Sequence, residues 1–239
     1  MRGCQASDGA MIKRLVCLAN SRKLHGRCIA GRELLTGNPG EWIRPVSDRE
    51  HEEVSEYERQ YDDGSDPSVL DIIDVPLIGP KAKSYQPENW LLDPVAYWSK
   101  AGKFGHDDLD LLTDAPGPIW VNGHHTYNGR NDYVTVEEAD KTDGSLKLIA
   151  VDDGLQLRVY RPGKAFGDPK RRVQAEFSFS GVNYRLWVTD PLIETAYLAQ
   201  AAQADGVYTL DSRYLTISLG EPWEGRCYKL VAAVIGALP

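Results

Sequence analysis

Three short apolar runs, separated by polar breaks, follow one another near the start of the chain and most constrain its fold. The runs are Ile12–Leu18, Arg27–Gly31 and Glu41–Val46. Runs of this length, bounded by polar and glycine-containing segments, favour β-strands over helices. We therefore predict three strands, with Asn20–Lys23 as a loop that connects the first two.

The first two predicted strands and their connection are strongly cationic. No Asp or Glu occurs between Ile12 and Arg32, although the whole chain has a net charge of −8. Hydroxyl, amide and guanidinium groups on a loop suit a phosphate or a nucleic-acid backbone. The candidate anion-binding residues here are Asn20, Ser21, Arg22, Lys23 and Arg27. The alternative is a basic surface turn that balances acidic neighbours.

Helix and hairpin signals continue along the chain. Ser47 and Glu50 fit a capping box, so we predict a helix over residues 48–60. Asp190 followed by Pro191 predicts a second helix that ends near Ala204. Turn residues between β-rich segments predict two hairpins. The paired segments are residues 146–151 with 155–160, and residues 173–179 with 184–188.

A break rich in Pro and Gly at residues 115–118 divides the chain into halves of similar organisation. Five short strands with a helix between the later strands are typical of an OB-type barrel. We therefore predict a mainly β fold (α+β) of two OB-like small β-barrels with short helices. The predicted barrels occupy residues 11–115 and 116–239, and residues 1–10 are predicted to be an N-terminal extension.

The acidic net charge argues against indiscriminate nucleic-acid binding, which usually needs a basic domain. The charges are unevenly distributed, however. Residues 48–74 hold eleven Asp or Glu, whereas residues 158–172 hold six Arg or Lys against Asp168 alone. This second basic cluster is either another backbone contact or a solvated turn, and the sequence favours the turn.

Signatures of metal, cofactor and membrane binding are missing from the sequence. The four cysteines form no Cys-x-x-Cys pair, and no apolar run approaches the length of a membrane span. We expect no metal, no cofactor, no membrane contact and a cytoplasmic location without disulfides. His124 and His125 are adjacent, so on a strand they would point to opposite faces and not share an ion.

Six short motifs occur in a characteristic order along the chain. They are Leu18–Gly31, Glu41–Ser47, Val69–Leu77, Tyr85–Trp90, Val188–Pro191 and Leu215–Ile235. This order resembles the dual OB-fold domain family (DuOB). The resemblance implies two OB-like barrels. It also implies nucleic-acid recognition, as a sensor or accessory subunit in a prokaryotic defence or nucleic-acid-processing system.

Two of these motifs contain aromatic, guanidinium and amide groups that suit base recognition. Trp42 and Arg44 would share one face of a strand and hold a stacked base. The alternative places Trp42 in the core and pairs Arg44 with a carboxylate. Gln86 and Asn89 either read a base edge or satisfy their own loop, and Glu88 lies between them.

The last motif adds Ser218 and Lys229 to the candidate set. Ser218 fits a strand end better than a nucleophile, because a strand and not a helix follows it. Lys229 is a cation within an apolar strand. It either lines the same groove as Arg22 or extends its ammonium group to the surface.

Three functions agree with these observations. The first is a dual OB-fold module whose groove binds single-stranded or otherwise exposed nucleic acid. The second is an enzyme or enzyme subunit acting on a nucleotide-like or phosphate-bearing small molecule, and the motifs leave catalysis undecided. The third is a protein–protein adaptor that uses the acidic surface at residues 48–74.

Overall fold

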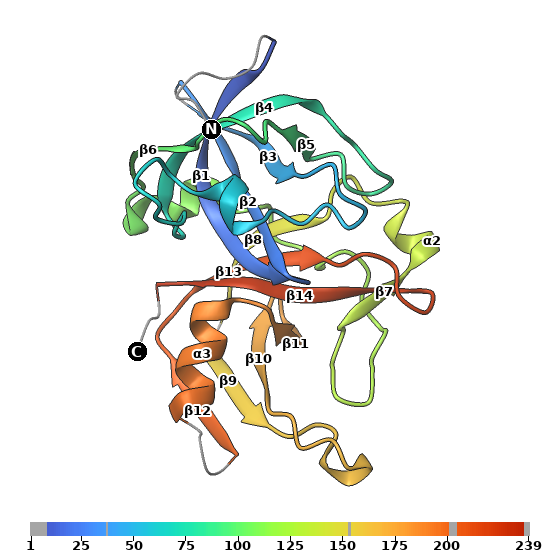
Figure 1. Ribbon diagram of the computed structural model, residues 1–239. Coiled ribbons are helices and arrows are strands. Elements are labelled where there is room, and N and C mark those ends of the chain that lie inside the picture. Colours follow the sequence, from blue (N-terminus) through green and yellow to red (C-terminus); the bar gives the residue numbers. More distant parts are fainter. Residues whose placement is uncertain (1–8, 37, 153, 201–204, 237–239) are drawn as a thin grey trace. The chain divides into compact units, whose positions relative to one another are not determined.

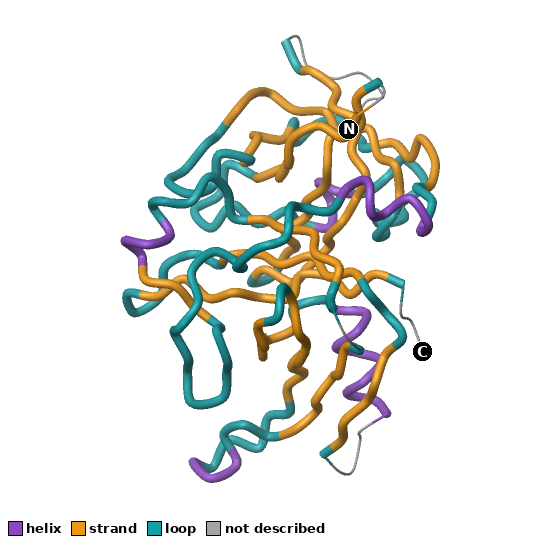
Figure 2. The backbone as a smooth tube through the Cα atoms, turned by 180° about the vertical axis from the view of Figure 1, so that it is seen from behind, coloured by secondary structure: helices purple, strands orange, loops and turns teal. Residues whose placement is uncertain are grey.

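The computed structural model describes residues 9–36, 38–152, 154–200 and 205–236, and these residues form mainly strands and loops (Figure 2). The predicted mainly β fold with short helices is therefore confirmed. The chain divides into two compact units, residues 1–112 and 113–239. Most of the proposed extension at residues 1–10 lies outside the described residues. Within the described ranges, no helix has both the length and the apolar character that a membrane crossing requires.

The strands of the first unit close into a barrel (Figure 1). They are β1 (Met11–Lys23), β2 (Gly26–Leu35), β3 (Asn38–Val46), β4 (Asp71–Pro80), β5 (Asn89–Leu92) and β6 (Ser99–Lys103). The pairing order is β1-β2-β3-β5-β4-β6, and β4 pairs again with β1 to close the circuit, which leaves β6 outside it. The core inside it includes Leu15, Ile43, Ile73 and Trp98, all nearly inaccessible to solvent.

The long first strand closes the barrel because it changes partner along its length. Residues 11–16 of β1 pair with β4, and residues 15–23 pair with β2. The predicted loop at Asn20–Lys23 is therefore wrong, because these residues continue β1. The turn is Leu24-His25, where Leu24 takes a φ of 49° and lets Lys23 pair with Gly26.

The predicted helix over residues 48–60 is also largely wrong. The segment contains only α1 (Glu56–Arg59), whose capping box is formed by Ser55 and Glu58 instead of Ser47 and Glu50. Glu52 takes a φ of 58°, and Val54 exchanges both backbone hydrogen bonds with Arg27 of β2, so the helix cannot continue through these positions. The other helical segment of this unit is the 3-10 helix η1 (His106–Leu112).

Close strand contact in the first barrel depends on Gly31. An added Cβ at Gly31 would lie 2.1 Å from the Val16 carbonyl oxygen, whereas one at Gly79 would have no neighbour within 4 Å. We expect Gly31→Ala to lower the free energy of unfolding by about 1–3 kcal/mol through overpacking. Gly79→Ala should change it much less. Urea denaturation of both variants measures the difference, and equal effects would contradict this packing argument.

The second unit has a related strand order (Figure 1). Its strands are β7 (Tyr133–Thr135), β8 (Leu146–Ala150), β9 (Leu155–Tyr160), β10 (Arg172–Phe179), β11 (Val182–Val188), β12 (Gly206–Leu210), β13 (Tyr214–Leu219) and β14 (Arg226–Ile235). The order is β12-β9-β10-β11-β14-β13-β8, and β7 pairs with β14. The helical segments are α2 (Val136–Ala139), η2 (Lys164–Phe166) and α3 (Pro191–Gln200).

One of the two predicted hairpins is wrong. β10 and β11 pair as expected, but β8 pairs with β13, whereas β9 pairs with β10 and β12. At the break, Val151 donates its backbone N–H to Arg213 and Asp152 donates to Ser178. β8 and β9 thus correspond to the two halves of β1, interrupted where the chain changes partner.

The cap of α3 agrees with the sequence. The Asp190 carboxylate accepts hydrogen bonds from the backbone N–H groups of Leu192 and Ile193 at 3.0 and 3.4 Å. Its other oxygen accepts from Val234 in β14 at 3.2 Å, which ties the helix start to the sheet. The predicted continuation over residues 201–204 lies outside the described residues.

Candidate functional site

Three neighbouring strands of the second unit present a polar and aromatic face. Alternate residues of β9, β10 and β11 point inward and are buried, such as Leu157, Ala175 and Leu186. The residues between them lie on the opposite face. On β9, β10 and β11 these include Arg158, Tyr160, Arg172, Gln174, Glu176, Arg185 and Trp187. Gln174 is fully buried among them.

Two aromatic rings and two guanidinium groups are stacked on this face. The rings of Tyr160 and Trp187 lie 6.1 Å apart with an interplanar angle of 19°. The Arg172 guanidinium carbon is 5.8 Å from the centre of the Trp187 ring, and that of Arg158 is 5.8 Å from the Tyr160 ring. A stacked pair of rings with a cation at each end favours flat, electron-rich or anionic ligands.

Hydrogen bonds hold this array in place. The Glu176 carboxylate lies 3.2 Å from Arg158 and 3.0 Å from Arg185. Burial opposes ionisation of Glu176, but the hydrogen bonds and charges of Arg185 and Arg158 outweigh it and lower the pKa of this carboxyl. The Tyr160 hydroxyl donates to Gln174 at 2.7 Å. The side chains of this face are thus held in place before a ligand binds. Their net charge is positive, because Glu176 is one carboxylate beside Arg158, Arg172 and Arg185.

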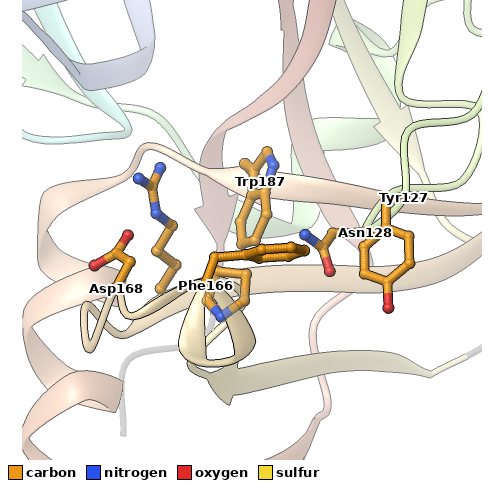
Figure 3. A pocket seen from close by; sticks show the side chains of 8 residues that line it. Tyr127, Asn128, Phe166, Asp168 and Trp187 are labelled. Carbon is orange, nitrogen blue, oxygen red and sulfur yellow. The ribbon is translucent and has the colours of Figure 1, made fainter.

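A cavity of about 400 Å³ opens beside Trp187 and Arg172. In Figure 3, Phe166 lies below Trp187, with Asp168 on one side and Asn128 and Tyr127 on the other. The side chains of Tyr127 and Phe166 are 91% and 82% exposed, so their rings are accessible to a ligand. A volume of this size accommodates a small planar group such as a nucleobase.

The connection between β9 and β10 supplies further positive charge beside the cavity. It carries η2 and extends beyond the ends of these strands (Figure 1). Lys164 and Lys170 are exposed, whereas Arg161 pairs with Asp205 at 3.1 Å. Gly163 fits tightly here, because an added Cβ would lie 2.6 Å from the Cβ of Asp168. The connection is therefore a folded rim of the cavity and not only a solvated turn.

The structure divides the predicted anion-binding residues of the first unit into exposed and buried ones. Arg22 is exposed at the β1–β2 turn, and Lys23 and Arg27 are partly exposed. Ser21 is buried and donates to the Cys28 carbonyl at 3.4 Å. Asn20 donates to the Pro67 carbonyl at 2.8 Å. The hairpin thus presents its cations, while the hydroxyl and the amide stabilise the fold.

Arg44 and the predicted base-reading residues lie together in a buried cluster of the first unit, because β3 and β5 pair in parallel. Arg44 forms an ion pair with Glu88 at 3.2 Å and donates to Asn89 at 3.3 Å. Asn89 in turn donates to Gln86 at 3.1 Å. All four side chains are buried. Asn89 and Gln86 bond within their own loop, and Arg44 pairs with a carboxylate, so the alternatives noted from the sequence describe these contacts.

Trp42 is also buried, with only 8% of its surface exposed. The guanidinium group of Arg32 lies over its ring, 5.0 Å from the ring centre. Its ring is therefore not an open surface for a stacked base, and the core alternative describes its position.

Lys229 lies neither in a groove nor at the surface, which corrects both sequence interpretations. It is 1% exposed, and its ammonium group donates to the Val121 carbonyl at 2.6 Å. Burial lowers its pKa to about 7, although the charges of Asp132 and Glu138 act in the opposite direction. Ser218 lies one residue before the end of β13 and is partly exposed. The predicted strand end is thus confirmed.

Sequence reasoning did not select the aromatic residues of the β9–β11 face. A signal was present, since Tyr160 and Trp187 alternate with buried residues, each two positions from an arginine. The register between three strands is needed to bring them together. The described residues contain no group of three His, Cys, Asp or Glu side chains that could hold a metal ion.

The comparisons with known proteins identify the family. No curated protein and no solved structure matches the chain. The family model of the dual OB-containing domain matches residues 13–234, which is nearly the whole chain. This match agrees with the closed circuit of the first unit and the related strand order of the second. The chain therefore belongs to the dual OB-containing domain family.

Proposed function

We propose that the chain binds single-stranded nucleic acid on the β9–β11 face of its second unit. The observation that carries this proposal is the stacked Tyr160–Trp187 pair with Arg172 beside an open cavity. Bases stack on such rings regardless of sequence, and guanidinium groups neutralise the phosphates between them. A base must be unpaired to enter a cavity of about 400 Å³, which favours single strands over duplexes.

The fold supports this location. OB-folds bind oligonucleotides on the face of their second and third strands and with the loop between the first and second. By their pairing order, β10 and β11 occupy the second and third positions, and the connection carrying η2 occupies that loop. The positive residues at 158–172 offset the acidic net charge locally. A strand could therefore bind here despite the repulsion expected from the rest of the chain.

The cations of the first unit add a second set of proposed phosphate contacts. Arg22, Lys23 and Arg27 lie around one tight turn. These residues would contribute charge without reading a base. A role as a sensor or accessory subunit in prokaryotic defence or nucleic-acid processing would follow from strand binding, and it belongs to the same proposal.

Fluorescence anisotropy with labelled single- and double-stranded DNA and RNA across a salt series tests the proposal. We expect Phe166→Ala to weaken single-strand binding about tenfold, because it removes an exposed stacking ring. Arg172→Ala should also weaken binding and reduce the magnitude of the salt slope by about 0.7, the value for one phosphate contact. The double change Arg22→Ala, Lys23→Ala tests the hairpin contacts in the same way.

Two matched variants control for non-specific effects. Tyr57→Ala removes an exposed ring of the first unit, and Arg213→Ala removes an exposed arginine outside the cavity. Both should bind like the unchanged protein. Loss of binding in these controls, or tight binding that survives Phe166→Ala and Arg172→Ala together, would contradict the proposed site. Binding of mononucleotides with little salt dependence would instead favour the small-molecule alternative.

A further inference from the structure

A second set of aromatic side chains forms a continuous ladder in the same unit. The rings of His124 and Tyr133 are stacked with centres 5.2 Å apart. The next two steps, from Tyr133 to Tyr228 and from Tyr228 to Trp223, are 6.2 Å each. The ladder thus contains four rings at nearly regular spacing.

Strand pairing explains why these rings are neighbours. Tyr133 of β7 is directly opposite Tyr228 of β14 in the antiparallel register. The next residues of β14, Cys227 and Lys229, point to the other face and are buried. Trp223 forms a bridge with Arg226, which folds the β13–β14 connection back beside Tyr228. Trp223 is 61% exposed, so this end of the ladder is open to solvent.

The ladder lies close to the cavity because one anchored loop contributes to both. His124 belongs to the ladder, and Tyr127 and Asn128 line the cavity. Because His124 and Tyr127 are three residues apart, their Cα atoms lie at most about 11 Å from each other, so the His124 end of the ladder is near the cavity. The Trp223 end lies up to three ring steps beyond His124.

The loop is held in a defined conformation. The backbone N–H of Thr126 donates to the buried Asp132 carboxylate at 2.8 Å. Gln174 of β10 donates to the Asn128 carbonyl at 3.0 Å. The first anchor closes the loop on itself just before β7, and the second ties it to β10, so the spacing between His124 and the cavity is fixed before a ligand binds.

We propose that the ladder is a second stacking surface for the same nucleic-acid strand, reached by nucleotides that extend beyond the cavity. This inference rests on the proposed function and adds a length requirement to it. Short oligonucleotides occupy the cavity alone. Longer ones also stack on Trp223 and Tyr228, and their affinity rises accordingly.

The charges around the ladder specify the kind of contact. Arg226 lies over the Tyr133 ring, 4.9 Å from its centre, while a ring nitrogen of His124 is hydrogen-bonded to Glu138 at 3.0 Å. Glu224 is exposed beside Trp223. Because cations and carboxylates are mixed here, ring–base stacking and not phosphate neutralisation supplies the added affinity. The gain with length should therefore change little with salt, unlike binding at the cavity.

Anisotropy with labelled oligothymidylates of about four, eight and twelve nucleotides, lengths within the usual range for an OB-fold, tests this inference. For the unchanged protein we expect affinity to rise with length. Trp223→Ala should leave the affinity of the shortest oligomer unchanged and remove about tenfold of the gain for the longest. Trp223→Phe should retain most of that gain, and Tyr57→Ala should retain all of it.

The outcomes separate the ladder from the cavity. If the longest oligomer binds Trp223→Ala as tightly as the unchanged protein, the ladder is not used and the inference is wrong. If Trp223→Ala weakens the shortest oligomer equally, Trp223 belongs to the cavity site and the length requirement is wrong. If no oligomer binds the unchanged protein at low salt, the proposed function fails and the ladder inference fails with it.

Discussion

Arg44→Ala is expected to lower the free energy of unfolding by about 3–5 kcal/mol, because it leaves the buried Glu88 carboxylate without its ion-pair partner. The two side chains are only 5% and 4% exposed and lie 3.2 Å apart. The substitution also removes the hydrogen bond to Asn89. Chemical denaturation followed by circular dichroism measures the loss.

A paired substitution separates the lost charge partner from lost packing. Arg44→Met combined with Glu88→Met removes both charges and keeps similar side-chain volume, so it should recover most of the lost stability. Arg14→Ala breaks the exposed pair with Asp74 and should have little effect. Under conditions in which it is folded, the double variant Arg44→Met, Glu88→Met should still bind nucleic acid. If it folds normally but loses binding, Arg44 would have the ligand-contacting role first considered from the sequence.

Local patterns in the sequence predicted the strands better than their partners. The turn at Ser180–Gly181 joins two strands that do pair, β10 and β11. The similar pattern at residues 152–154 interrupts a strand where it passes from β13 to β10. A short polar break looks the same in both cases, because the choice of partner depends on residues far along the chain.

The candidate site could not be predicted for the same reason, because it also depends on which strands pair. Arg44, Glu88 and Asn89 are polar residues in family-like motifs, and only the parallel pairing of β3 with β5 brings them into one buried network. Tyr160 and Trp187 lie on different strands, and both lie beside β10, which pairs with each strand. Composition located the basic cluster at residues 158–172. It could not show that aromatic rings stand next to it.

Stability should rise with pH above neutrality because Lys229 is buried. Its pKa is about 7 in the folded chain, against an ordinary value of 10.5. Between these values the unfolded chain binds more protons than the folded chain, so raising the pH favours folding. Between pH 7 and pH 9 this effect raises the free energy of unfolding by about 2 kcal/mol. Between the folded and the unfolded pKa it raises it by on the order of 4 kcal/mol.

Comparison with Lys229→Met isolates this contribution. The variant keeps an unbranched side chain in the same space but cannot titrate, so its unfolding free energy should lack the rise between pH 7 and pH 9. The Val121 carbonyl loses its 2.6 Å hydrogen bond, which lowers stability by a similar amount at every pH. Lys141→Met, an exposed lysine in the same unit, should keep the full pH dependence.

The proposed pH range ends at 9 because a second buried group begins to affect stability near that pH. Burial raises the pKa of the Cys17 thiol to about 12, so stability falls once the thiol of the unfolded chain ionises. That effect is the same in both proteins, and the difference between them at each pH depends on Lys229 alone. Urea denaturation at several pH values gives this difference directly. A difference that stays constant from pH 7 to pH 9 would mean that Lys229 remains charged in the folded chain.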